Sequence, residues 1–202
     1  PILGTAVRLL DQSWLPAEDN PVLQKVNDQL FDYSSVPLVS LSGSNATVHI
    51  GGASRIEAGG ALDLSAYAQS TAAPSFSSPL LFAAAWGETN TASRLVVDGA
   101  SLLRAGQAAR LGATTDVELD VTATVNSTNK PIDAVFARGL SRIETTVDLG
   151  QGTTTDAASL EVTALTQADI QVQADASNTG ASGLGFAVAV NESTSTTTAS
   201  LG

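Results

Sequence analysis

Apolar and polar residues alternate strictly between positions 119 and 126. The odd positions are apolar: Leu119, Val121, Ala123 and Val125. The even positions are polar or acidic: Asp120, Thr122, Thr124 and Asn126. A period of two is typical of a β-strand with one buried side and one side in solvent. Residues 170–177 repeat the pattern, which predicts a second strand of the same kind.

Turn-forming residues separate these predicted strands. Gly-Gly occurs at 59–60, Asp-Gly at 98–99, Gly-Gln-Gly at 150–152 and Asn-Thr-Gly at 178–180. Glycine and asparagine tolerate the backbone angles that tight turns need. Helix signals are almost absent after residue 35, so this part of the chain is predicted to be all-β.

The sequence repeats about every fifty residues. Residues 52–61 return at 99–108, an offset of 47, and residues 109–113 return at 160–164, an offset of 51. Phenylalanine-led segments begin at Phe82, Phe136 and Phe186, which keeps the same spacing. A period in this range is typical of solenoids, propellers and tandem arrays.

The small size of the inward residues favours a right-handed parallel β-helix, that is, a β-solenoid. Alanine, valine, leucine and isoleucine dominate the inward positions, and aromatic residues make up only 4% of the chain. Stacked coils bury such residues in a narrow interior. We expect each repeat to form two coils of roughly 25 residues. A kelch-type propeller has a similar period, but Trp86 has no aromatic equivalent at Leu140 or Val190.

Residues 1–38 differ in style from the rest of the chain. Residues 20–31 read as a short helix, with Asn20 as the N-cap, Pro21 in the first turn and an apolar stripe beyond it. Either this segment covers a solenoid end or it docks against another domain or subunit. The domain boundaries expected from the repeats are 1–38 for a cap or insert and 39–202 for the solenoid, with repeats at 39–85, 86–136, 137–187 and, in part, 188–202.

Composition narrows the classes of function. The net charge is −11 and the chain holds 9 lysines and arginines together, which argues against binding to nucleic acid or to anionic membranes. Cysteine is absent, which removes disulfides, thiolate catalysis and sulfur-ligated zinc. No apolar run is long enough for membrane insertion. The chain begins at proline rather than methionine, and we expect it to be part of a longer protein.

Residues 56–66 resemble the repeated "xIxAGGxLxLxA" phrases of giant secreted bacterial β-solenoid proteins, including filamentous-haemagglutinin-like exoproteins. Residues 186–191, followed by a Ser/Thr run, resemble repeats of very large surface adhesins. The likeness covers residues 39–202. It implies a structural stalk or passenger segment of an exported adhesin, secreted or on the cell surface, whose partners are neighbouring repeats and host or matrix glycans or proteins.

The acids at Asp116, Glu118 and Asp120 alternate along one predicted strand and should face solvent together. Calcium binds several oxygen ligands, so these three residues are the candidate metal site, and the chain lacks the Gly-Gly-x-Gly-x-Asp run of calcium-binding β-rolls. A solvated surface that resists aggregation is the other interpretation. No other cofactor is expected.

Three further sets of polar residues have a structural interpretation. His49 alternates with Val48 and Ile50 and should point outward without a catalytic partner. The equivalent residues Asp63, Arg110 and Glu161 should lie about 9–10 Å apart, too far for direct pairing, if two coils form each repeat. The hydroxyl residues that recur one double period apart should line an outer face, as threonine ordinarily does in strands, and a ladder that orders water or presents hydroxyls to sugars is the less favoured interpretation: Thr89, Thr91, Ser93, Ser193, Ser195 and Thr197.

An enzyme of the polysaccharide lyase or hydrolase type is the least favoured interpretation. Arg138 and Lys130 lie near Asp133 in the sequence, but nothing marks a cleft there. We therefore expect a non-enzymatic, mechanical role. The alternative is a glycan- or calcium-binding module that uses the outward Ser/Thr and Asp/Glu faces.

Overall fold

A computed structural model describes residues 38–79, 81–128, 132–178 and 183–202 of this chain. Strands occupy most of these residues, and no helix occurs among them. The prediction of an all-β chain is confirmed there. The helix expected at 20–31 lies outside the described residues, as does almost all of the expected N-terminal cap. Leu38 is the first residue of the first strand.

The strands form three parallel sheets, which we name A, B and C. The A sheet contains, in spatial order, β1 (Leu38–Ile50), β5 (Phe82–Val97), β8 (Ile132–Leu149) and β11 (Leu184–Leu201). The B sheet contains β2 (Arg55–Ala58), β6 (Leu102–Ala105) and β9 (Thr154–Asp156). The C sheet contains β3 (Leu62–Ala72), β7 (Ala108–Ser127) and β10 (Ser159–Asn178), and β4 (Ser75–Ser78) pairs with β7 beyond the end of β3.

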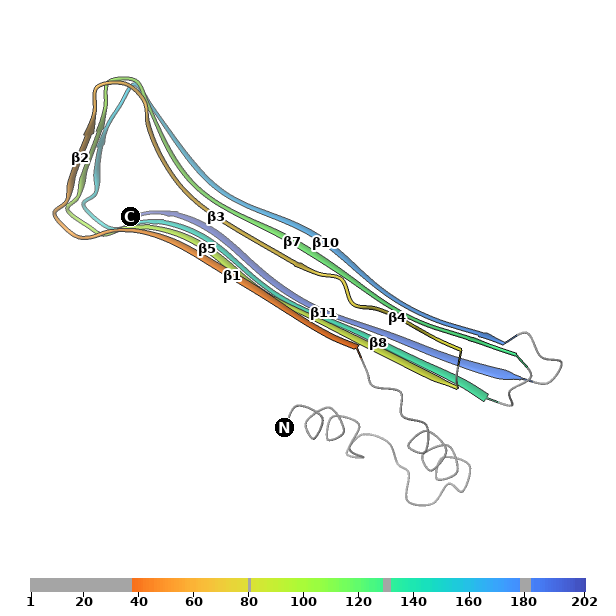
Figure 1. Cartoon of the computed structure of the whole chain (residues 1–202). Helices are drawn as coiled ribbons and strands as arrows, with labels where there is room; N and C mark the ends of the chain where they lie inside the picture. The colour runs from red at the N-terminus through yellow and green to blue at the C-terminus, as the bar shows by residue number, and fades with distance from the viewer. Residues whose placement is uncertain (1–37, 80, 129–131, 179–182) are drawn as a thin grey trace, which may run out of the picture.

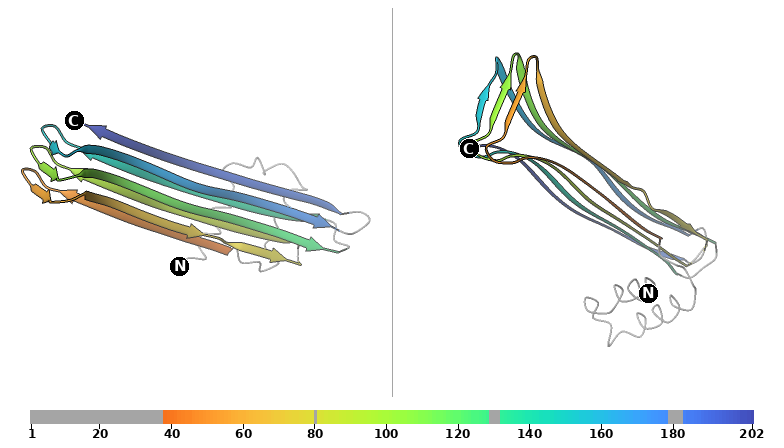
Figure 2. Two further views of the ribbon diagram at one scale, coloured as in Figure 1. Left: turned by 90° about the horizontal axis from the view of Figure 1, so that it is seen from above. Right: turned by 60° about the vertical axis from the view of Figure 1, so that its left-hand side comes forward.

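Each coil passes through the A, B and C sheets in turn and then enters the A sheet again one strand further on (Figure 1). The long A and C sheets face each other, and the short B sheet closes the wider end of the coil. Figure 2 shows the successive coils stacked side by side. This is the topology of a parallel β-solenoid.

The expectation of two coils in each repeat is wrong. Leu38 pairs directly with Ala85, and Phe82 pairs directly with Ala134, so residues one full repeat apart in the sequence are neighbours in the A sheet. One repeat therefore forms one coil. The physical reason is strand length, because β5, β7 and β8 contain 16, 20 and 18 residues, so a single circuit uses the whole repeat.

Alternation fixes the inward side of the long strands. On β7 every odd-numbered residue from Ala109 to Ser127 is buried, whereas the even positions are exposed or half-buried. Leu119, Val121 and Val125 have no exposed surface. The inward face predicted for residues 119–126 is confirmed.

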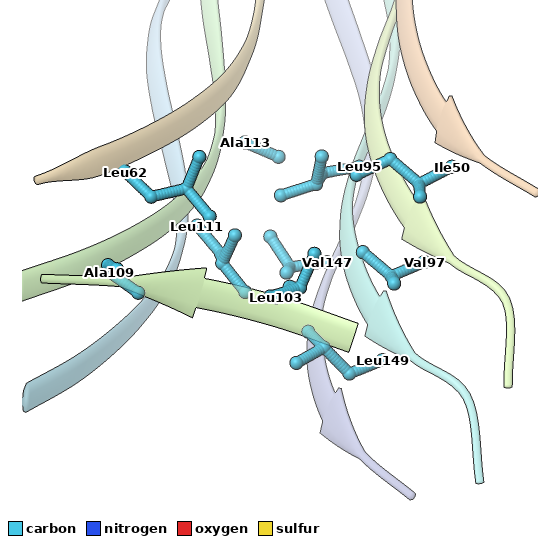
Figure 3. Packing of buried hydrophobic residues seen from close by; sticks show 11 residues of the cluster. Ile50, Leu62, Leu95, Val97, Leu103, Ala109, Leu111, Ala113, Val147 and Leu149 are labelled. Atoms are coloured by element: carbon cyan, nitrogen blue, oxygen red, sulfur yellow. The ribbon is translucent and has the colours of Figure 1, made fainter. Parts of the chain in front are cut away.

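Two apolar clusters occupy the interior. The first lies near the B sheet and includes Leu95, Leu103, Leu111 and Val147, which converge from all three sheets (Figure 3). The second lies toward the opposite end of the coil, where Val121 and Val125 pack between the A and C sheets. The members of both clusters stack on equivalent residues of neighbouring coils, as in Leu95 beside Val147.

The corner before the B sheet needs a left-handed residue in each coil. Ala53 has a φ of 57°, Ala100 of 62° and Gly152 of 79°. These three positions are equivalent in the repeat. A left-handed conformation costs an alanine about 1 kcal/mol relative to glycine, so packing of the coils holds the two alanines in this geometry.

A band of buried hydroxyl groups separates the two apolar clusters, and this contradicts the outward orientation expected for these residues. Thr89, Thr91 and Ser93 are on the inward side of β5 and at most 1% exposed. The odd-numbered residues of β5 face inward rather than outward as we expected, and Ala85, Leu95 and Val97 lie on the same inward face. The other three residues of this set continue the same inward columns on the edge strand β11, where they are exposed: Ser193, Ser195 and Thr197.

Hydrogen bonds across the interior satisfy these hydroxyl groups. Thr145 Oγ1 donates to Thr115 Oγ1 at 2.8 Å, and it lies 2.7 Å from Thr166 Oγ1. Thr166 in turn lies 2.7 Å from Thr197 Oγ1. Ser93 Oγ donates to the carbonyl oxygen of Ala66 at 2.7 Å. The band thus joins the A and C sheets with polar contacts of defined geometry.

Replacing Thr145 by valine should lower the free energy of unfolding by about 1–2 kcal/mol, because the shape is kept and two buried hydrogen bonds are lost. Urea denaturation of the purified chain measures this change. Thr124→Val, on the outer side of β7, is the matched control and should change the free energy by less than about 0.5 kcal/mol. Equal stability of the Thr145 variant and the natural chain would contradict the proposed contribution of the hydroxyl band.

Candidate functional site

A groove lies on the outer face of the A sheet. It crosses all four strands and has a volume of about 820 Å³. Residues from each strand contribute to its wall, among them Asn45, Asn90, Arg142 and Thr194. The hollow forms where Gly43 and Ala92 place almost no side chain on this face.

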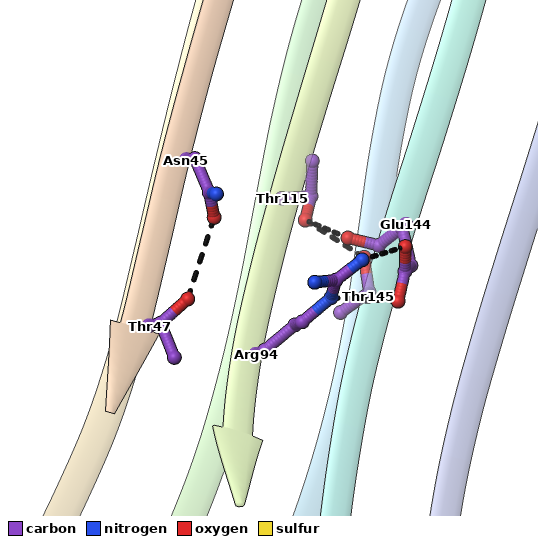
Figure 4. A network of polar contacts seen from close by, with 6 residues as sticks. All are labelled: Asn45, Thr47, Arg94, Thr115, Glu144 and Thr145. Atoms are coloured by element: carbon purple, nitrogen blue, oxygen red, sulfur yellow. Dashed lines mark hydrogen bonds and ion pairs between the residues drawn. The ribbon is translucent and has the colours of Figure 1, made fainter. Parts of the chain in front are cut away.

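Arginine–glutamate pairs connect neighbouring coils along this groove. Arg94 Nε donates to Glu144 Oε1 at 2.7 Å, and a second bond joins Arg94 Nη2 to Glu144 Oε2 (Figure 4). Arg142 Nη1 lies 3.2 Å from Glu88 Oε1. The bidentate bond from Arg94 holds the pKa of Glu144 below its usual value, and the same bond raises the pKa of Arg94.

The charges in the groove are therefore largely balanced. Asn45 on β1 accepts a hydrogen bond from Thr47 at 3.4 Å. Asn90 on β5 adds an amide to the same face, and Thr194 on β11 adds a hydroxyl. Amides, hydroxyls and paired charges suit a neutral, hydroxyl-rich ligand better than an anion, because both arginines of the groove already have a carboxylate partner.

The predicted metal ligands lie on a different surface. Asp116, Glu118 and Asp120 are on the outward side of β7 in the C sheet. Among the residues that the structure describes, no group of three or more His, Cys, Asp or Glu side chains is placed to hold a metal ion. Asp116 instead accepts hydrogen bonds from Tyr67 at 3.4 Å and Gln69 at 3.3 Å.

The neighbours of the other two acids also indicate a solvated surface. Asp120 accepts a bond from Thr122 at 3.3 Å. Glu118 is aligned with Asp169 on the adjacent strand, which places two acids side by side. Like charges in this position repel each other in the absence of a cation.

His49 points outward, as predicted, and has a partner that the sequence pattern did not reveal. Its Nε2 lies 3.0 Å from Asp98 Oδ2, and both side chains are about half exposed. Asp98 follows β5, so the pair joins two successive coils. The available signal was the separation of the two residues in the sequence, which is 49 residues and thus two more than the 47-residue offset between β1 and β5.

The residues Asp63, Arg110 and Glu161 are closer than expected. They are direct neighbours on β3, β7 and β10, and Arg110 Nε lies 3.4 Å from Glu161 Oε2. The larger separation that we expected is wrong because one repeat forms one coil. A second column of the same kind lies in the B sheet and contains Glu57, Arg104 and Asp156.

This second column links the three strands of the B sheet. Arg104 Nε donates to Asp156 Oδ2 at 2.8 Å, and its Nη1 lies 3.6 Å from Glu57 Oε1. A hydrogen bond from Arg55 is the main cause that lowers the pKa of Glu57. Across the described ranges every arginine has an acidic partner: Arg55, Arg94, Arg104, Arg110, Arg138 and Arg142.

Two residues of the enzyme interpretation, Asp133 and Arg138, lie on opposite sides of β8. Asp133 is fully buried and accepts bonds from Ser127 Oγ at 2.7 Å. Arg138 lies on the opposite, outer side of β8, where its guanidinium is 4.8 Å from the centre of the Trp86 ring and 3.3 Å from Glu192. Lys130 lies outside the described residues.

Within the described ranges there is no helix with the length and hydropathy needed to cross a membrane. Comparison with protein families, with curated proteins and with solved structures found no match for this chain. The interpretation of its function therefore depends on the coil architecture and the surfaces described above.

Proposed function

We propose that this chain is a structural segment of a right-handed β-solenoid, which acts as a rigid stalk or passenger region of a large exported bacterial adhesin. The observation that supports this role best is the direct stacking of equivalent residues from coil to coil in all three sheets. Such stacking produces an elongated rod, and each added coil adds to its stability. Right-handed winding follows the strong preference of parallel strand connections for that hand.

The inward columns favour a mechanical role over a catalytic one. Apolar residues stack at both ends of the coil and hydrogen-bonded hydroxyl groups stack between them. Ion pairs between coils on the outside keep the surface polar while they fix the register. The resemblance to exported adhesin repeats agrees with this role and supports a location outside the cell.

Thermal unfolding in excess calcium and then in chelator tests the stalk against a calcium-binding module. We expect the same midpoint in both conditions, because the acids of β7 form no metal site in the described residues. A ligand that binds only the folded chain stabilises it by about 2.7 kcal/mol when the free ligand concentration is one hundred times the Kd. A large upward shift of the melting midpoint with calcium would therefore contradict a stalk that binds no calcium.

The groove on the A sheet supports a second candidate function, the binding of a neutral glycan. Its paired charges, amides and hydroxyls are suited to sugar hydroxyl groups. Titration with neutral oligosaccharides tests this function by calorimetry. Glycan binding that is lost in Asn90→Trp, which fills the groove, and kept in Thr124→Trp on the C sheet would establish this function. If the natural chain binds no oligosaccharide, the stalk is the only proposed function that stands.

A further inference from the structure

Outward side chains of the A sheet are apolar at the end of the coil away from the B sheet. On β5 they are Phe82, Ala84 and Trp86, and on β8 they include Phe136 and Leu140. We name these five residues the outer apolar patch. The C sheet packs against the opposite, inward face, so no strand in the described ranges covers the patch. Because β5 and β8 are the two middle strands of the sheet, the patch is not a feature of an open sheet edge.

Burial in the outer apolar patch differs from burial at other outward positions. On β7, the middle strand of the C sheet, every outward residue is exposed or half-buried. In the patch, Ala84 and Leu140 are each 7% exposed, which interrupts the alternation of burial along β5 and β8. The indole N–H of Trp86 and the Nε of Arg138 are buried there, and neither has a hydrogen-bond partner in the part of the chain that the structure describes. An unpaired buried donor costs free energy, so an acceptor placed over the patch would stabilise the fold.

The chain enters β1 beside this patch. Leu38 is the first residue of β1 and pairs with Ala85, which lies between two residues of the patch. Residues 32–37, which connect Leu38 to the segment before it, can span at most about 20 Å. The four strands of the A sheet together span only about 14 Å. Residues 20–31 are therefore tethered within reach of the whole patch, at an effective concentration in the millimolar range.

The sequence of residues 20–31 suits an apolar surface. Val22, Val26 and Leu30 recur at helical spacing and form one apolar stripe. A helix over this range would be about 18 Å long, which is enough to cross the four strands. An isolated helix of this length is marginal in water, because most helical stability in proteins comes from packing of an apolar face. This segment therefore requires a surface of the kind that the patch provides.

We propose that residues 20–31 of this chain bind to the outer apolar patch through their apolar stripe. Binding removes the aromatic side chains of the patch from water and brings backbone and side-chain acceptors of the segment to the unpaired donors of Trp86 and Arg138. The segment then covers one side of the coil and leaves the end of the solenoid free. The proposal goes beyond the stalk role and does not depend on it.

Trp86 reports on the cover of the patch. The chain has two tryptophans, so Trp14→Phe leaves Trp86 as the only one, and we expect acrylamide to quench its fluorescence weakly. In this background, Leu30→Asp puts a carboxylate into the apolar stripe. The change should shift the equilibrium toward release of the segment by at least about tenfold, because a buried leucine side chain is lost. We expect stronger quenching of Trp86 and an emission maximum at longer wavelength, with an unchanged strand signal in circular dichroism.

Gln29→Asp in the same background is the matched control, because it introduces the same charge next to the stripe. Its quenching should equal that of Trp14→Phe alone. Leu30→Ala removes apolar surface without a charge and should raise the quenching in the same direction, so it decides the matter if Leu30→Asp fails to fold.

Equal quenching of Trp86 in all of these chains would overturn the proposal. Quenching in the Trp14→Phe chain that rises on dilution, together with a dimer in sedimentation velocity, would assign the patch to a second copy and would also overturn it. Neither outcome bears on whether the solenoid serves as a stalk.

Discussion

Replacing Val121 by aspartate is expected to abolish the folded state at room temperature. Val121 has no exposed surface and packs in the second apolar cluster, where Leu119, Ala123 and Ala85 are among the buried members. A carboxylate in that position has no cation or donor from the cluster and must lose its hydration. Removing the partner of a buried charge costs about 3–5 kcal/mol, and a charge introduced with no partner should cost at least as much.

The control for this prediction is Thr122→Asp on the adjacent, outward position. Its side chain is half-buried and bonds to Asp120, so a second acid there adds only mild repulsion. We expect a loss below about 1 kcal/mol, measured by urea denaturation followed by circular dichroism. Similar tolerance of aspartate at both positions would contradict the orientation of β7.

Much of the fold could be predicted from the sequence because its signals are local. The period of two from Leu119 to Val125 indicates the inward face of β7 without any knowledge of its neighbours. The offsets between repeated phrases in the sequence equal the offsets between paired residues of β3, β7 and β10. A repeat that stacks on itself carries its own register in the sequence, which is why these predictions agree with the structure.

The number of coils in each repeat could not be predicted in the same way. A period of about fifty fits either one long circuit or two short ones, and only the pairing of strands, such as that of Leu62 with Ala109, decides between them. The distance within the column of Asp63, Arg110 and Glu161 depended on that choice. The wrong number of coils in each repeat therefore also made the expected distance between these three residues wrong.

The buried hydroxyl band was missed because threonine is common both on the outer face of a strand and, when it is hydrogen-bonded, on the inner face. Residues 89–93 contain polar residues on both faces, so alternation alone does not fix the phase. The phase follows from Leu95 and Val97, which lie further along the same strand on the same face. The groove was missed for a different reason, because its residues come from four strands that are adjacent only after the coils stack.

The close approach of the A and C sheets depends on two inward glycines, and Gly87 is the more constrained. A Cβ at this position would lie 2.6 Å from Leu119 Cδ1 and 2.6 Å from Val121 Cγ2. At the equivalent position of the next coil, Gly139, a Cβ would lie 3.2 Å from Leu119 Cδ2. Leu119 thus fills the space above both glycines, and the sheets can approach only where these side chains are absent.

Gly87→Val should therefore lower the free energy of unfolding by about 3 kcal/mol, at the upper end of the cost of overpacking a core. Gly112→Val, on the outward side of β7, should be neutral or slightly stabilising, because its Cβ meets nothing closer than 3.9 Å and valine favours strands. Urea denaturation compares the two. Adding Leu119→Ala to Gly87→Val should cost less than the sum of the single changes, since the alanine vacates the space that valine needs. Strict additivity would show that Leu119 does not oppose position 87, and would contradict the packing that brings the two long sheets together.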